Sequence, residues 1–280
     1  MMHETKDKWL RKYKQKTGIF HNLTNKEYHE SEGLSSPFVK KYLTTTPFHA
    51  IQPSEDPSPS VVDIGSGVHA MFEGKNRKQA VIGKHKTRAG KQWAEDYQQA
   101  KEDGVILLPE GEYAKAMQMT KALWKHKDIR KIARNKTAVK EASVYTIDKK
   151  TGLLLKARPD LYTTDKGIIL DVKTFGKIPT EKNFFKQFVD LAYGYQAAFY
   201  KRVCEQENIQ CIYFAFAVVE KKPPHSTNLF LMSQELMRIY EERLDDVLKE
   251  IKEAEKTGDY STGWPSFTML HPTEWMDNQL

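Results

Sequence analysis

Apolar residues recur at helical spacing over much of the chain. Over residues 60–73, for example, Val61, Ile64 and Val68 fall on one face, which predicts a helix. The motif Ser35-Ser-Pro37 predicts another helix start, since proline is favoured in the first helical turn. Similar patterns predict helices over 88–102, 110–127, 181–207 (broken near Tyr193-Gly194) and 234–256.

The period changes between these helices. Residues 139–147, 153–161 and 167–174 are short, apolar or β-branched segments separated by turn sequences, and they predict a three-stranded meander. Residues 209–219 are the most apolar run and predict a central strand buried on both faces. Residues 227–232 predict an edge strand. The order of elements therefore indicates an α/β fold with a mixed central sheet flanked by helices, and additional helices at its N-terminal side.

Length and composition bound this picture. The 280 residues (32.4 kDa) predict one large domain over 35–256, preceded by a polar, loosely structured arm (1–34) and followed by a tail (257–280). No apolar run approaches the ~20 residues of a membrane-spanning helix, and the N-terminal sequence lacks the apolar segment of a secretory signal. The two cysteines, Cys204 and Cys211, form no C-x-x-C pair, so we expect a reduced, cytoplasmic protein without a membrane partner.

The distribution of charge suggests a partner. The net charge is +7, and residues 75–91 hold seven basic residues and no acidic one. Residues 121–140 hold eight basic residues and one acid. Such stretches either contact a polyanion such as DNA, with Lys84, Lys86 and Arg88 as candidates, or form solvated lysine-rich surfaces.

The candidate chemistry lies in the last turn of the meander. If the turn centres between Asp165 and Lys166, residues whose numbers sum to 331 face each other, which places Asp160 opposite Asp171. Two opposed carboxylates repel, and a divalent cation between them would remove that penalty. Strand alternation puts Lys173 on the same face as Asp171. A solvated hairpin with no such role is the alternative.

Four short motifs around this hairpin occur in the order found in a known superfamily. Pro159-Asp160…Asp171-Val-Lys173 resembles the PD-(D/E)xK nuclease signature. Gly65-Ser-Gly-Val-His69-Ala-Met-Phe-Glu73 and Gln196-Ala-Ala-Phe-Tyr200 resemble two elements of its RecB-type branch. Together with Glu141-Ala-Ser-Val and Tyr193-Gly-Tyr-Gln-Ala-Ala, they resemble the RecE-type exonucleases of phages and prophages, over about residues 35–219. The resemblance implies a restriction-endonuclease-like core.

The resemblance also implies roles for individual residues. Asp160, Asp171, the Val172 carbonyl and His69 would bind Mg²⁺, one or two ions, with Mn²⁺ able to substitute. Lys173 would position or deprotonate the attacking water and neutralise developing charge.

Several further assignments stay open. His69 is either a metal ligand or a satisfied core histidine, and Glu73 either accepts a hydrogen bond from its imidazole or only caps the helix. Glu141 either approaches the metals or lies at the surface. Gln196 and Tyr200, four residues apart on one helix face, either contact the scissile phosphate or brace Lys173, or are polar residues at a helix–sheet boundary. Arg158 is a candidate phosphate contact.

The function that the resemblance implies is a Mg²⁺-dependent exodeoxyribonuclease. It would degrade duplex DNA ends 5′→3′ and leave a 3′ single strand for recombination by a single-strand annealing protein. Relatives of this kind form ring-like homo-oligomers. Two alternatives are a single-strand or structure-specific endonuclease of the same fold, and a DNA-binding scaffold without catalytic activity.

Overall fold

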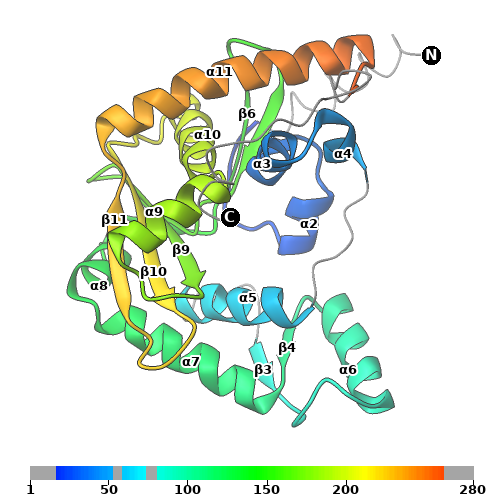
Figure 1. The fold of residues 1–280 in the computed structure, drawn as a ribbon, viewed down its shortest axis with the longest axis vertical. Helices are drawn as coiled ribbons and strands as arrows, with labels where there is room; N and C mark the ends of the chain where they lie inside the picture. Colours follow the sequence, from blue (N-terminus) through cyan, green and yellow to red (C-terminus); the bar gives the residue numbers. More distant parts are fainter. Residues whose placement is uncertain (1–16, 53–58, 74–80, 262–280) are drawn as a thin grey trace, which may run out of the picture.

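The computed structural model describes residues 17–52, 59–73 and 81–261 (Figure 1). Its largest sheet has five strands in the order β11-β10-β9-β8-β5. These are β11 (Thr227–Leu231), β10 (Tyr213–Glu220), β9 (Ile168–Phe175), β8 (Leu161–Thr163) and β5 (Ala138–Lys140). β9 and β10 run parallel and the other pairs are antiparallel, so the sheet is mixed, as predicted.

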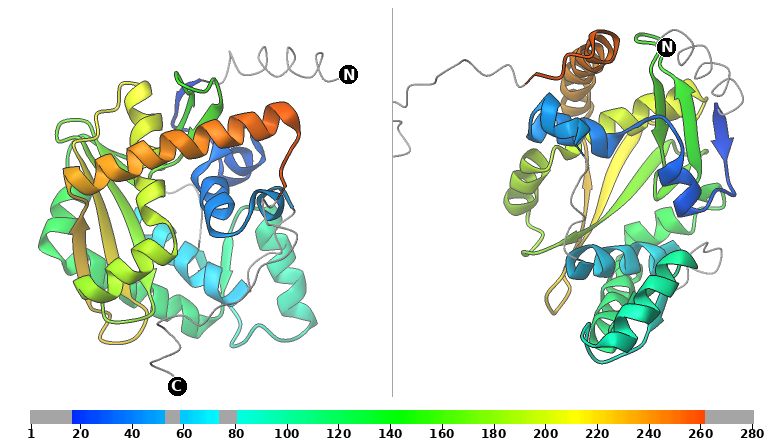
Figure 2. Two further views of the ribbon diagram at one scale, coloured as in Figure 1. Left: turned by 45° about the horizontal axis from the view of Figure 1, so that its top comes forward. Right: turned by 90° about the vertical axis from the view of Figure 1, so that its right-hand side faces the viewer.

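Helices cover both faces of this sheet. The predicted helices form as α3 (Ser36–Thr44), α5 (Pro59–Glu73), α6 (Lys91–Glu102), α7 (Glu110–Lys125), α9 (Glu181–Asp190), α10 (Tyr193–Gln206) and α11 (Gln234–Thr257). Figures 1 and 2 show α9, α10 and α11 on one side of the sheet and α5 and α7 on the other. Short elements that the sequence pattern did not predict are α2 (Asn25–Glu30), α4 (Pro47–Ile51), α8 (Lys127–Ala133) and the parallel pair β3 (Val81–Gly83) and β4 (Ile106–Leu108).

The alternation of side chains along the central strands creates two cores. In β10, Phe214 and Phe216 join the core under α9, α10 and α11, while Ala215 and Ala217 join the core under α5 and α7. The prediction of a strand buried on both faces is therefore confirmed. In β9, Leu170 and Val172 face the α5 side, so Asp171 and Lys173 lie on the opposite face of the strand.

The predicted single meander is wrong, because its first two segments each divide between two sheets. β6 (Ser143–Ile147) and β7 (Leu154–Ala157) pair with each other and belong to a second sheet in the order β1-β6-β7-β2. The chain leaves this sheet at Arg158-Pro159-Asp160, where proline has no N–H for a ladder bond. Glu141, with φ of 51°, makes the corresponding break between β5 and β6.

The described part of the predicted N-terminal arm is folded. β1 (Gly18–Phe20) and β2 (Leu34–Ser35) form the two edges of the second sheet, and α2 lies between them. The expectation of a loosely structured arm is therefore wrong for residues 17–34, whereas residues 1–16 and most of the predicted tail (262–280) lie outside the described residues. No helix in the described ranges has both the length and the hydropathy needed to cross a membrane.

Replacing Gly194 by alanine is expected to destabilise the fold. An added Cβ would lie 2.3 Å from a ring atom of Tyr240, where α10 crosses α11. Overpacking of this kind costs about 1–3 kcal/mol. Gly111→Ala is the matched control, because Gly111 is also the second residue of its helix but has open space around it. Urea unfolding should show a loss for Gly194→Ala and no loss for Gly111→Ala; equal stability of the two variants would contradict the packing.

Candidate active site

The β8–β9 hairpin has the register predicted from its turn. Leu161 pairs with Leu170 and Thr163 with Ile168. The numbers of each pair add up to 331, so the predicted register of the hairpin is confirmed. Asp160 directly precedes β8, and its Oδ2 accepts a hydrogen bond of 2.6 Å from the backbone N–H of Val172. This hydrogen bond holds the Asp160 carboxylate against the backbone of β9, the strand that carries Asp171.

His69 reaches this hairpin from α5. Its Nδ1 lies 3.1 Å from Oδ2 of Asp160, which confirms that the two residues are close in space. Burial opposes protonation of the imidazole, but the charge of Asp160 and the hydrogen bond to it raise the pKa of His69 above its usual value. The reverse interaction lowers the pKa of Asp160 despite the burial of its carboxyl group. His69 thus contacts the Asp160 carboxylate and is not an isolated core histidine.

Gln196 connects Asp171 to Lys173. Its Nε2 donates to Oδ1 of Asp171 at 2.7 Å, and its Oε1 accepts from Nζ of Lys173 at 3.3 Å. Nζ of Lys173 also lies 2.5 Å from Oδ2 of Asp171. Gln196 therefore braces the lysine, one of the roles expected for it, while Tyr200 packs its ring against Phe214 one turn further along α10.

The electrostatics favour a charged lysine. Burial lowers the pKa of Lys173, but the charges of Asp171, Tyr193 and Asp160, together with the hydrogen bond to Asp171, raise it above its usual value. Lys173 is therefore an ammonium ion at neutral pH. It can neutralise charge that develops on a phosphate and orient a water, but it is a poor base for removing a proton. For Asp171, burial and the charge of Asp160 raise the pKa.

Glu141 is half-buried at the wall of a cavity. Burial, then the negative charges of Asp160 and Glu73, raise the pKa of Glu141 well above its usual value. The side chains of Glu141 and Glu73 hydrogen-bond to each other, so Glu73 has a role other than the two expected for it. Glu141 also donates its backbone N–H to the carbonyl oxygen of Asp160, at 3.3 Å. Four acidic side chains from α5 and the two sheets thus gather within electrostatic reach of one another.

The donor set fits a divalent cation. Within the described residues no three His, Cys, Asp or Glu side chains form a ready-made metal cage. However, Oδ2 of Asp171 is buried and has no hydrogen-bond partner there, although Nζ of Lys173 is close. The 3.1 Å between His69 Nδ1 and Asp160 Oδ2 matches the separation, about 3 Å, of neighbouring ligands on an octahedral ion with bonds of ~2.1 Å. His69, Asp160 and Asp171 could hold Mg²⁺; the Val172 carbonyl stays a prediction.

The surface around the site is divided by charge. A cavity of about 470 Å³ on the Lys173 side is also lined by Lys40, Lys41 and Tyr193. A second cavity, of about 280 Å³, lies on the Glu141 side and is lined by acidic residues, with Arg158 and Lys26 at its wall. A polyanionic strand would be attracted to the first cavity and a cation to the second.

Arg158 is hydrogen-bonded to other parts of the protein. It is 8% exposed and donates to Oγ of Ser143 at 2.6 and 2.9 Å and to Oδ1 of Asn25 at 2.7 Å. It also donates to the carbonyl oxygens of Leu23 and Thr24, both at 3.2 Å. Arg158 thus ties the segment before α2 to the second sheet, and its contact with phosphate remains only a prediction.

Replacing Arg158 by methionine is expected to lower the free energy of unfolding by about 3 kcal/mol, because buried acceptors lose a charged donor. Arg238→Met, which changes an arginine 71% exposed on α11, should have an effect below about 0.5 kcal/mol. Urea unfolding measures both. If Arg158→Met leaves stability unchanged but flattens the salt dependence of DNA binding, the phosphate contact would be the correct role.

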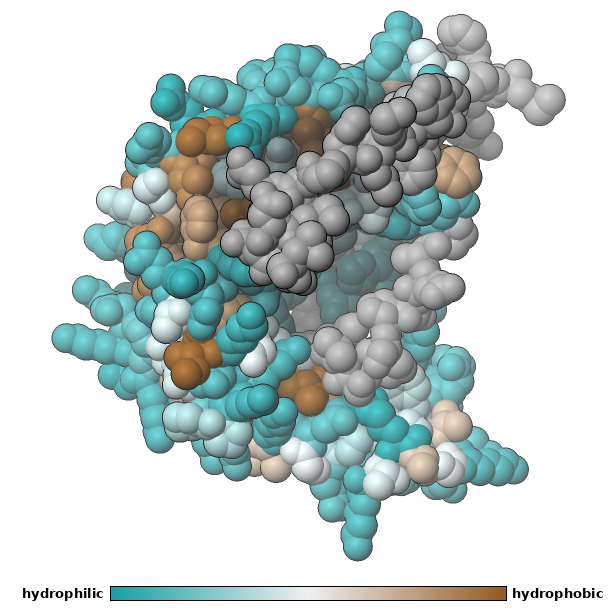
Figure 3. All heavy atoms as spheres, viewed as in Figure 1, coloured by the Kyte–Doolittle hydropathy of each residue, from teal (hydrophilic) through white to brown (hydrophobic). Residues whose placement is uncertain are grey.

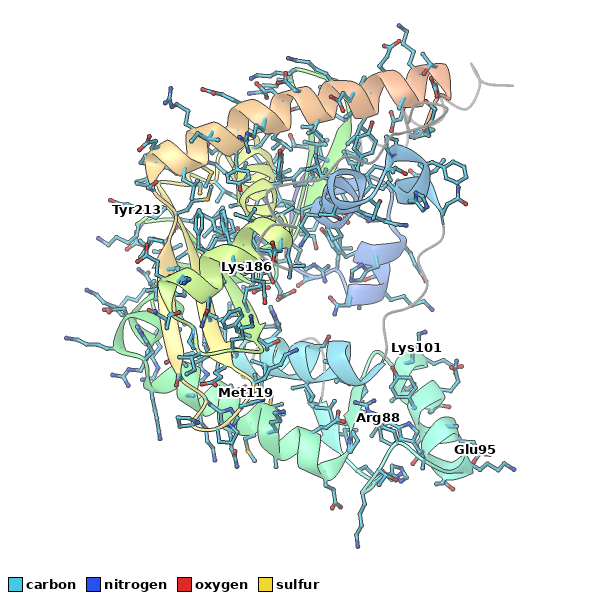
Figure 4. All side chains as sticks on the ribbon, viewed as in Figure 1. Arg88, Glu95, Lys101, Met119, Lys186 and Tyr213 are labelled. Carbon is cyan, nitrogen blue, oxygen red and sulfur yellow. The ribbon has the colours of Figure 1, made fainter. Side chains whose placement is uncertain are left out.

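The first basic stretch holds its charges partly in ion pairs. Nζ of Lys84 lies 2.6 Å from Oδ2 of Asp96 on α6, and Arg88 is paired with Glu112 on α7. Lys86 is exposed. In Figure 4, Arg88 lies beside α6 at the lower right, well away from β9. Because residues 74–80 lie outside the described residues, the DNA-binding role of this stretch stays a prediction.

Comparison with known proteins agrees with this geometry. Residues 21–263 match the family model described as "PDDEXK-like domain of unknown function (DUF3799)". The chain belongs to this family. The predicted superfamily, the PD-(D/E)xK nucleases, and the predicted fold class are therefore confirmed. The search of curated proteins found no match.

A solved structure shares the fold of this PDDEXK-like domain. It is a protein from Eubacterium rectale named "Putative exonuclease", with a TM-score of 0.60 and 15% identity, and the match covers 92% of this chain and 98% of that one. A second structure, named SSO0001, matches over 82% of this chain and 89% of its own, at 10% identity and a TM-score of 0.31. The second likeness is too weak to support an argument.

Proposed function

We propose that this PDDEXK-like protein is a Mg²⁺-dependent deoxyribonuclease that hydrolyses phosphodiester bonds at the Asp160–Asp171–Lys173 site. The observation that supports this most is the convergence of His69 from α5, the two aspartates from the hairpin and Gln196 from α10 on one place. The signature that resembles PD-(D/E)xK supplies the aspartates and Lys173, and the two RecB-type elements supply His69 and Gln196.

Different residues of the site would bind the metal and stabilise the transition state. His69, Asp160 and Asp171 would hold Mg²⁺, which supplies positive charge that polarises the phosphodiester and the attacking water. The Val172 N–H fixes Asp160. Lys173, held protonated by Asp171, stabilises the extra negative charge of the transition state.

For the substrate we infer duplex DNA ends, degraded 5′→3′ to leave a 3′ single strand. The support is the RecE-type resemblance of the four motifs, together with a fold shared with a protein named as an exonuclease. A ring-like homo-oligomer and delivery of the strand to a single-strand annealing protein rest on the same resemblance.

A digestion time course tests these statements. The substrates are linear duplexes labelled at either the 5′ or the 3′ ends, and a covalently closed duplex, each with Mg²⁺, with Mn²⁺ and with EDTA. The expected result is metal-dependent early release of the 5′ label, late loss of the 3′ label, and no cutting of the closed circle. Cutting of the circle would instead indicate an endonuclease. Salt-dependent binding without any product would indicate a non-catalytic scaffold.

A further inference from the structure

A second lysine reaches the amide that braces Lys173. Lys40, on α3, donates from Nζ to Oε1 of Gln196 at 3.3 Å, the same distance at which Lys173 donates to that atom. Both ammonium groups also lie over the ring of Tyr193, at 5.4 Å for Lys40 and 4.8 Å for Lys173. Two positive charges from distant parts of the chain are therefore neighbours at one amide oxygen.

Among the residues that the structure describes, one of these two lysines has a carboxylate in direct contact and the other has none. Lys173 has the Asp171 carboxylate at 2.5 Å, whereas within the described residues no carboxylate oxygen lies within 4.0 Å of Nζ of Lys40. Burial, and then the charge of Lys173, lower the pKa of Lys40 to about 8. Two ammonium groups this close, Lys40 and Lys173, repel each other, and an anion bound between them would remove that repulsion.

There is room for such an anion beside Lys40. The cavity of about 470 Å³ between α3 and α10 is lined by Lys40, Lys41, Thr44, Lys173, Asp190, Leu191 and Tyr193. Its one acidic side chain, Asp190, is paired with Nζ of Lys186 at 2.9 Å, on the α9 segment where Figure 4 labels Lys186. Lys41 donates to the carbonyl oxygen of Gln52, whereas Lys40 and Lys173 both donate to Gln196.

The side chain of Gln196 separates the two roles. Its Nε2 donates to Asp171 and its Oε1 accepts from both lysines, but of the two lysines Lys173 is the one that also contacts the Asp171 carboxylate. Lys173 is therefore the lysine that serves the scissile phosphate. Lys40 is suited to the next phosphate along the same strand.

We propose that Lys40 binds the phosphate group adjacent to the scissile phosphate and so positions the DNA strand in the active site. This inference rests on the proposed function and assigns a substrate contact that the sequence motifs did not include. Helical spacing gives a hint of it: Ser36 and Val39 are buried on the inner face of α3, and Lys40 is the next residue on that face.

The test compares Lys40→Gln, Lys40→Arg and a control, Lys249→Gln, which changes a lysine 64% exposed on α11. Dissociation constants for a labelled duplex with a 3′ overhang are measured by anisotropy in EDTA over a range of salt concentrations. Lys40→Gln should weaken binding about fivefold to tenfold and lower the log–log salt slope by about 0.7–0.9, the value for one lost phosphate contact. Lys40→Arg should retain the slope, and Lys249→Gln should behave as the unchanged protein.

Two further measurements separate a phosphate contact from a structural brace. Because the bond from Lys40 to Gln196 is long, at 3.3 Å, Lys40→Gln should keep its thermal stability, and in Mg²⁺ its KM should rise more than its kcat falls. An unchanged affinity and salt slope, or a lowered stability with an unchanged slope, would overturn the proposal.

The two proposals fail in different ways. If the unchanged protein binds DNA and cleaves it, but Lys40→Gln does the same with equal constants, only the role of Lys40 is lost. If the unchanged protein neither binds nor cleaves DNA, the proposed function itself is wrong.

Discussion

Replacing Asp160 by asparagine is expected to reduce DNA cleavage at least about a thousandfold, the scale on which a lost group for transition-state charge or metal binding acts. Asp160 lies between two elements of the site, because one of its oxygens accepts from the Val172 N–H and also faces the His69 imidazole. Asparagine has nearly the same shape but no charge. The variant should therefore fold and should bind Mg²⁺ more weakly.

Asp165→Asn is the matched control for this change. Asp165 lies in the turn of the same hairpin, where its carboxylate accepts from Thr137 and Asn135 on the outside of the protein. Cleavage rates, Mg²⁺ titration calorimetry and thermal unfolding should be measured for both variants. Retention of most activity by Asp160→Asn, with the control also active, would mean that the hairpin is not the site of the chemistry.

Replacing Lys173 by methionine is expected to reduce cleavage by a factor of about a hundred to a thousand, since a preorganised charge at the transition state is lost. The same change should spare Mg²⁺ binding, because it removes a cation that competes for the Asp171 carboxylate. Loss of cleavage without loss of Mg²⁺ binding would distinguish Lys173 from the aspartates, whose removal should weaken both cleavage and Mg²⁺ binding.

Lys166→Met in the hairpin turn provides the control for the Lys173 change, since Lys166 is exposed. Single-turnover cleavage and Mg²⁺ calorimetry are the measurements. If Lys173→Met weakens Mg²⁺ binding as strongly as Asp160→Asn does, Lys173 would act by organising the metal site and not on the phosphate. If it cleaves at the normal rate, the assigned role is wrong.

Exposed apolar side chains on one side of the molecule are a separate feature of the surface. Figure 3 shows apolar atoms toward the left of the view, on the side where Figure 1 places α9 and β11. Phe185 and Leu231, from these two elements, are 50% and 56% exposed and line one cavity of about 400 Å³. β11 is also an edge strand of the five-stranded sheet.

The sequence by itself determined most of the longer helices and strands and the register of the β8–β9 hairpin. The turn at Asp165–Lys166 sets which residues face each other, and this information is contained within about a dozen consecutive residues. The continuous apolar run over residues 209–219 likewise identified β10 as a strand buried on both faces, although the strand begins only at Tyr213. The break between α9 and α10 was also predictable, and it falls at Ala192, which has φ of 52°.

Only the tertiary structure decided which strands share a sheet and which side chains meet in the site. Periodicity reports that a face is buried, but not what covers it, so the division of the meander at Glu141 and Pro159 into two sheets could not be foreseen. The same holds for β1 and β2, which pair with strands more than a hundred residues away. Lys40 reaches Gln196 because α3 packs against α10, and such a contact depends on long-range packing that no local pattern specifies.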